Sequence, residues 1–153
     1  MFELYPVLKF IHIAAVVCWI GGGVLLSLLV EQVRRGGNAA ELTSIIDRME
    51  WFGPRYFMPL SFVTLIAGIG LTQIGWSFSQ AWVSIGFTGL IISGAINGGY
   101  LSRKGRTLKA LIASKGANSA EAQAAIGQLL MVARIDLLVL TLVVADMVFK
   151  PGA

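Results

Sequence analysis

The side chain best suited to chemistry is His12, the only histidine among the 153 residues. It lies in the apolar stretch KFIHIAAVVCWIGGG, residues 9–23, three positions after Lys9. An imidazole can bind a metal or carry a proton near neutral pH. A protonatable group among apolar residues is costly unless it has a partner or a task, so the sequence predicts that another segment supplies one to His12.

A second group of candidate side chains lies near the C-terminal end, in the stretch DMVFKP. Helical rotation of about 100° per residue places Lys9, His12 and Trp19 along one side of the first helix. In the same way it places Asp146, Met147 and Lys150 along one side of the last helix. If the first and last helices are antiparallel neighbours, both groups lie at a similar depth, and His12 faces Asp146 and Met147. The candidate site then consists of Lys9, His12, Trp19, Asp146, Met147 and Lys150, with Trp76 and Trp82 at a similar level.

The elements that must position these residues are membrane helices. Hydrophobic residues make up 56% of the chain and charged residues only 13%, which is more apolar surface than a soluble domain of this length can bury. A helix of about 20 apolar residues crosses a bilayer core. Four blocks reach that length, at residues 6–30, 56–75, 81–101 and 130–149. The prediction is a single all-α domain over residues 1–153, a polytopic membrane protein built as an antiparallel bundle of four transmembrane helices.

Basic residues give the orientation of this bundle. The segments that join spans one to two and three to four hold nine of the twelve lysines and arginines, whereas the link GWSFSQ between spans two and three has none. Positive loops stay on the cytoplasmic side. Both termini are therefore predicted outside, in a bacterial inner membrane. This rule accounts for the net charge of +4, and no nucleic-acid partner is needed to explain it.

The first basic segment is predicted to contain a short amphipathic helix at residues 39–52. Asn38 and Glu41 have the spacing of a capping box, as do Asn118 and Glu121 at the start of the last helical pattern. The apolar stripe consists of Leu42, Ile45, Ile46, Met49 and Phe52. Gly53 and Pro54 are expected to break the run, so the helix is predicted to lie on the cytoplasmic membrane surface.

Small residues mark the helix faces that can approach closely. Ala14, Cys18 and Gly22 recur every four residues on the first helix, and Gly94 and Gly98 form a GxxxG pair on the third. Such faces drive helix association in lipid. Packing within the chain is the favoured interpretation, and a homodimer through these faces is the alternative.

A second polar cluster is predicted nearer the basic loops. Asp136 and Asn97 lie at a similar depth on the fourth and third spans. Arg55 and Arg134 are expected near the same depth. Ionisable groups inside bundles usually pair. The prediction is a structural brace in which Asn97 meets Asp136 and one of the two arginines neutralises its charge.

Three motifs, taken in order, carry a resemblance to a known family. They are KFxHIxAxxxWIGGG at the start, WSFSxxW before the third helix and DMVFKP at the end. In this order they resemble a bacterial family of predicted small integral membrane proteins of unknown function, over nearly the whole chain. The first helix alone also resembles membrane-embedded haem-containing protoporphyrinogen oxidases and copper-resistance membrane proteins. Those groups place further histidines on other helices, and this chain has none, so two histidine ligands to one haem cannot come from one chain.

Three functions remain open from the sequence. The favoured one is binding of haem b, with His12 and Met147 as axial ligands and Lys9 and Lys150 holding the propionates. The second is a copper or other soft-metal site at His12 and Met147, with Cys18 as a further ligand. The third is a bundle without a cofactor, structural or partner-binding, in which His12 bonds Asp146 and the lysines extend to the interface. No motif for hydrolysis or phosphoryl transfer is present, and whether any reaction is catalysed stays open.

Overall fold

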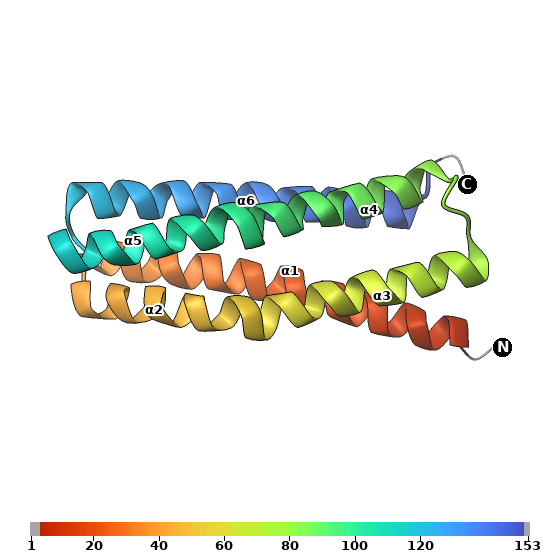
Figure 1. Cartoon of the computed structure of the whole chain (residues 1–153), viewed down its shortest axis with the longest axis horizontal. Helices are drawn as coiled ribbons and strands as arrows, with labels where there is room; N and C mark the ends of the chain where they lie inside the picture. Colours follow the sequence, from red (N-terminus) through yellow and green to blue (C-terminus); the bar gives the residue numbers. More distant parts are fainter. Residues whose placement is uncertain (1–3, 152–153) are drawn as a thin grey trace.

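In the computed structural model, which describes residues 4–151, the chain forms four long helical rods packed side by side (Figure 1). The rods run over Leu4–Gly36, Ala39–Gly75, Ala81–Lys115 and Ala120–Phe149, and each is apolar enough to be a candidate membrane span. Their elements are α1 (Leu4–Gly36), α2 (Ala39–Phe52), η1 (Gly53–Phe57), α3 (Met58–Gly75), α4 (Ala81–Gly94), η2 (Ala95–Leu101), α5 (Ser102–Lys115) and α6 (Ala120–Phe149). The predicted all-α bundle of four long apolar helices is confirmed.

The rods are longer than a bilayer core is thick. At about 1.5 Å per residue, 30 to 37 residues of helix span roughly 45–55 Å, against about 30 Å of hydrocarbon. One end of the bundle holds α2, α5, the turn at 37–38 and the turn at 116–119 (Figure 1). We call this the basic end. The opposite end, with the start of α1, the 76–80 link and the end of α6, is called the link end.

The helix predicted at residues 39–52 has these bounds in α2, but it does not lie apart from the bundle on a membrane surface. It continues through η1 into α3 as one rod, and it buries Leu42 and Ile46 against the other helices. The expected break at Gly53 and Pro54 is instead a π-helical turn, in which the Met58 N–H bonds to the Gly53 carbonyl. A proline removes one donor and crowds the preceding turn, and a wider turn accommodates both effects.

The turns at the basic end are fixed by side-chain caps. Asn38 accepts bonds from the N–H groups of Ala40 and Glu41, at 3.1 and 3.3 Å, and so begins α2 as predicted. At the second turn the cap of α6 is Ser119 rather than Asn118, because the Ser119 hydroxyl accepts the Ala122 N–H at 3.3 Å. Asn118 instead donates to the Gly37 carbonyl at 2.9 Å and joins the two turns.

The bundle consists of two closely packed pairs. Helix α1 packs most extensively on α3, and α4 on α6. Close approach within each pair depends on glycine: a Cβ at Gly22 would meet the Tyr56 ring, and one at Gly89 would collide with Val143. Gly22 of the small-residue stripe on the first helix is therefore in contact within the chain, whereas Cys18 of the same stripe is exposed. Gly94 and Gly98 face open space, and a homodimer through them stays a prediction.

Candidate functional site

A cavity of about 170 Å³ lies inside the bundle at the link end, between helices α1, α3, α4 and α6. Its walls are mainly aliphatic and aromatic. Five of the six predicted site residues line it: Lys9, His12, Trp19, Met147 and Lys150. The sequence-based grouping of these five residues around one space is thus found in the fold.

The hydrogen bond of His12 fixes which ring nitrogen is free. His12 is half-buried, and its Nδ1 lies 2.9 Å from the backbone carbonyl of Thr64 on α3. A carbonyl oxygen only accepts, so Nδ1 carries the proton and the neutral ring keeps its lone pair on Nε2. Within residues 4–151, no side chain or carbonyl is bonded to Nε2. Gly68 gives the ring room, because a Cβ there would lie 3.3 Å from Cε1.

The predicted pairing of His12 with Asp146 is wrong. The partner of His12 lies on α3, the helix on which α1 packs most extensively. Asp146 does not line the cavity. It immediately precedes Met147, and its side chain is rotated from that of Met147 by about 100° around α6. Its Oδ2 is buried without a hydrogen-bond partner among the described residues.

Met147 and Trp19 both form part of the cavity wall. Trp19 is buried, at 5% exposure. The terminal methyl group of Met147 lies where a Cβ of Gly86 would be, so this glycine on α4 lets the thioether reach inward. The cavity therefore has an imidazole on α1 and a soft sulfur on α6, held by two separate helix pairs.

Aromatic rings and a lysine close the cavity at the link end. The Lys150 Nζ lies 3.8 Å from the centroid of Trp76 and 5.3 Å from that of Trp82. The two indoles meet edge to face at 5.1 Å, and Trp76 Nε1 donates to the Tyr5 hydroxyl at 3.0 Å. A cation over indole faces is attracted by the ring quadrupole. Lys150 itself has a left-handed backbone, with φ of 45°, and it turns into this pair of rings.

Two cavity residues carry polar atoms without partners. The Thr64 hydroxyl and the Trp82 indole nitrogen are buried and unbonded within the described part of the chain. Buried polar groups normally have a partner in protein or water. These two groups, a hydroxyl and an N–H donor, are therefore unpaired polar groups of residues that line the cavity.

Cys18 is not part of this site. It lies on the exposed side of α1 and does not line the cavity. Its backbone carbonyl accepts the Tyr56 hydroxyl at 2.8 Å, which ties α1 to η1. Thr64, Gly68 and Tyr5 were missed by sequence reasoning. A backbone acceptor and a space-making glycine have no sequence signal of their own, because they act through the neighbouring helix.

A separate polar cluster lies around Asp136, which is buried at 4% exposure. Its Oδ2 accepts the Ser93 hydroxyl at 3.0 Å and the Asn97 amide at 2.6 Å. The predicted match of Asn97 with Asp136 is confirmed. The predicted arginine partner is wrong: Arg55 lies over the Trp51 ring, and Arg134 contacts Glu31. Arg134 is two positions before Asp136, on the opposite side of α6.

The fold and the cavity together define a class of protein. Four apolar helices exceed the thickness of a bilayer core, and their polar groups gather inside the bundle, which is the organisation of a polytopic integral membrane protein. The chain belongs to the family described as "Predicted integral membrane protein (DUF2269)", whose model matches residues 6–151. Neither the curated proteins nor the solved structures contain a match. The resemblance drawn from the three sequence motifs is confirmed.

Proposed function

We propose that this membrane protein binds haem b in the link-end cavity, with His12 Nε2 and Met147 sulfur as its axial ligands. The observation that carries the proposal is the bond from His12 Nδ1 to the Thr64 carbonyl at 2.9 Å. Metal-binding histidines typically donate their second ring N–H to a carbonyl or carboxylate, which fixes the tautomer and the ring. His12 has that second bond already, and its Nε2 is unbonded within residues 4–151.

The other cavity residues fit the chemistry of a haem. Walls of aliphatic and aromatic side chains suit the macrocycle, and Lys9 and Lys150 supply cations at the mouth for the two propionates. For Lys150 this requires leaving the Trp76 and Trp82 rings. A haem with imidazole and thioether ligands supplies a one-electron redox centre of raised potential. A redox or haem-handling role follows for the protein.

The size of the cavity sets a condition on this proposal. Its volume of about 170 Å³ is below the range of about 300–1,000 Å³ that ligand sites usually have. The imidazole and the thioether belong to different helix pairs, α1–α3 and α4–α6. Haem binding therefore requires these pairs to separate at the link end, while the packing within each pair is kept.

The small volume favours one second candidate, a single Cu(I) ion held by His12 and Met147. Imidazole and thioether are ligands suited to soft copper, and an ion needs no widening of the bundle. Among the described residues no group of three or more His, Cys, Asp or Glu side chains could hold a metal. Because Cys18 does not line the cavity, the ligands that remain from the sequence-based proposal are His12 and Met147.

The test is the absorption spectrum of the protein purified in detergent and supplied with haem. We expect a Soret band and sharp α and β bands after reduction. His12→Ala should abolish these bands, and Met147→Leu should leave haem bound with a changed spectrum and a lower potential. Cys18→Ala is the matched control on the same helix and should behave as wild type.

The outcomes separate the candidates. A featureless visible spectrum in the folded protein, together with copper at a fixed ratio that is lost in His12→Ala, would replace haem with the ion. Haem bands of equal strength in wild type and His12→Ala would remove His12 as a ligand. If neither wild type nor His12→Ala binds haem or copper, the bundle without a cofactor becomes the better description.

We also propose that the basic end faces the cytoplasm of a bacterium and the cavity faces outward. The support is charge: the positive-inside rule applies to the segments 31–55 and 102–116, which hold nine of the twelve basic residues. The link end has Lys9 and Lys150 only. The site would then be accessible from the periplasmic side of the inner membrane.

A further inference from the structure

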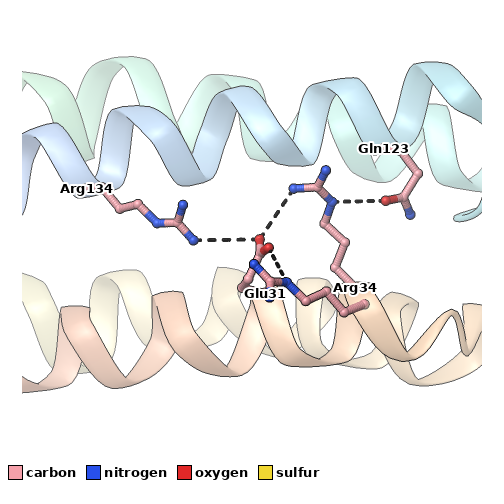
Figure 2. Close-up of polar contacts among 5 residues, drawn as sticks. Glu31, Arg34, Gln123 and Arg134 are labelled. Atoms are coloured by element: carbon pink, nitrogen blue, oxygen red, sulfur yellow. Dashed lines mark hydrogen bonds and ion pairs between the residues drawn. The ribbon is translucent and has the colours of Figure 1, made fainter.

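Three arginines surround one carboxylate where α1 meets α6 (Figure 2). Glu31 lies 2.8 Å from Arg35, 3.4 Å from Arg34 and 3.6 Å from Arg134. Arg34 is held from the other side as well, because its Nε donates to Gln123 on α6 at 3.1 Å. We call these five residues the arginine cluster. Three cations face one anion, so the cluster has an excess of two positive charges.

Two lysines elsewhere at the basic end have acidic partners of their own. Lys109 lies between Asp47 and Glu50, at 3.1 and 2.6 Å, and Lys115 pairs with Glu121 at 2.5 Å. These lysines have at least one acid each. In the arginine cluster, by contrast, one acid serves three cations and cannot satisfy their donors. A guanidinium has five N–H donors, and the contact of Arg134 with Glu31 uses one Nη2 group at the long distance of 3.6 Å.

The depth of the cluster places these unsatisfied donors near lipid headgroups. Glu31 directly follows the first predicted span, 6–30, and Arg134 lies one turn inside the fourth, 130–149. The side chain of Arg134 is 55% exposed, and that of Arg35 is 77% exposed. An exposed guanidinium at the membrane boundary needs an anionic partner or water. Phosphate oxygens match its planar donors in a bidentate geometry.

We propose that the arginine cluster binds the phosphate of an anionic phospholipid at the basic end of the bundle. Glu31 holds the guanidinium groups of Arg34 and Arg35 in place on α1, and Arg134 reaches toward them from α6 (Figure 2). The phosphate supplies negative charge for the arginines that Glu31 alone does not neutralise. The acyl chains of the lipid follow the apolar faces of the spans. The bound lipid thus joins α1 to α6 where the rods leave the bilayer.

The experiment measures lipid retention by native mass spectrometry of the full-length protein in neutral detergent. Phosphatidylglycerol and phosphatidylcholine are added in separate series. The double variant Arg35→Gln/Arg134→Gln should lose phosphatidylglycerol affinity by about thirtyfold, at about 1 kcal/mol for each arginine. The matched control Arg103→Gln/Arg106→Gln removes the same charge from α5 and should stay within about threefold of wild type.

Three results would overturn the proposal. Equal losses in the two double variants would mean that only net charge attracts lipid. Equal retention of phosphatidylcholine would remove the preference for an anionic headgroup. Displacement of the lipid by millimolar inorganic phosphate, with the same thermal stabilisation, would assign the cluster to a free anion. Because both pairs of arginines are exposed, we expect each variant to fold. Circular dichroism checks this.

Discussion

The two ends of the bundle are formed by the same four rods but differ in how their interiors are packed. At the basic end, nine buried residues from α1, α2, α5, α6 and the 116–119 turn form one packed cluster: Val30, Leu42, Ile46, Leu108, Ile112, Ala117, Ala122, Ile126 and Leu130. At the link end the same bundle encloses a cavity with polar atoms that have no partner. Every ion pair found within residues 4–151 lies at the basic end.

The difference follows from the solvent around each end. Rods of roughly 45–55 Å are longer than a core of about 30 Å. The cluster residues on α2 and α5 lie outside the spans predicted from the sequence, so we expect them to be surrounded by water. Burial of apolar side chains is strongly favourable there, at about 25 cal/mol per Å². Between helices in lipid that driving force is absent, and close packing of small residues takes its place. The basic end can therefore stabilise the bundle while the link end keeps an incompletely filled interior.

The prediction with the largest effect concerns the orientation of the two ends. A periplasm-dependent reporter fused after Lys150 should be active, and the same reporter fused after Gly37 or Gly116 should be inactive. Activity in cells is the measurement, with immunoblots to show equal amounts of fusion protein. The opposite pattern would place the cavity on the cytoplasmic side and reverse the comparison.

The second prediction compares apolar truncations at the two ends. Leu108→Ala removes a side chain with 1% exposure from the packed cluster and should destabilise the protein by about 2–5 kcal/mol. Leu71→Ala, in the cavity wall, should cost less than half as much, because it enlarges an existing space inside lipid. Thermal or denaturant unfolding in detergent measures both. Equal losses would show that both ends contribute alike to stability.

The third and smallest effect concerns the Asp136 cluster between the two ends. Asp136→Leu leaves the Ser93 hydroxyl and the Asn97 amide without their acceptor and should cost about 1–3 kcal/mol. Asp136→Asn keeps an acceptor oxygen for these donors and should retain most of the stability. The same unfolding assay applies. If Asp136→Asn folds normally but abolishes an activity found for the protein, its carboxyl group has a protonatable role beyond bracing.

Some parts of the site could be read from residue types and spacing. Helical rotation alone grouped Lys9, His12 and Trp19 on one face, and antiparallel order brought Met147 and Lys150 to the same depth. The structure adds the carbonyl of Thr64, which depends on how α1 rotates against α3. The structure also excludes Asp146 from the cavity lining. The face that α6 presents to the cavity is set by its packing on Gly86 and Gly89.

The sequence by itself determined the class of the protein, because four long apolar blocks can satisfy their backbone in lipid only as helices. It also determined the start of α2, through Asn38, and the meeting of Asn97 with Asp136 at one depth. Only the tertiary structure decided that α2 continues into α3, that Ser93 also bonds Asp136, and which groups become partners of His12 and Arg134. Spacing fixes the depth and face of a side chain along its own helix. The rotation and pairing of helices depend on packing between segments far apart in the chain, and that information is not local to any one of them.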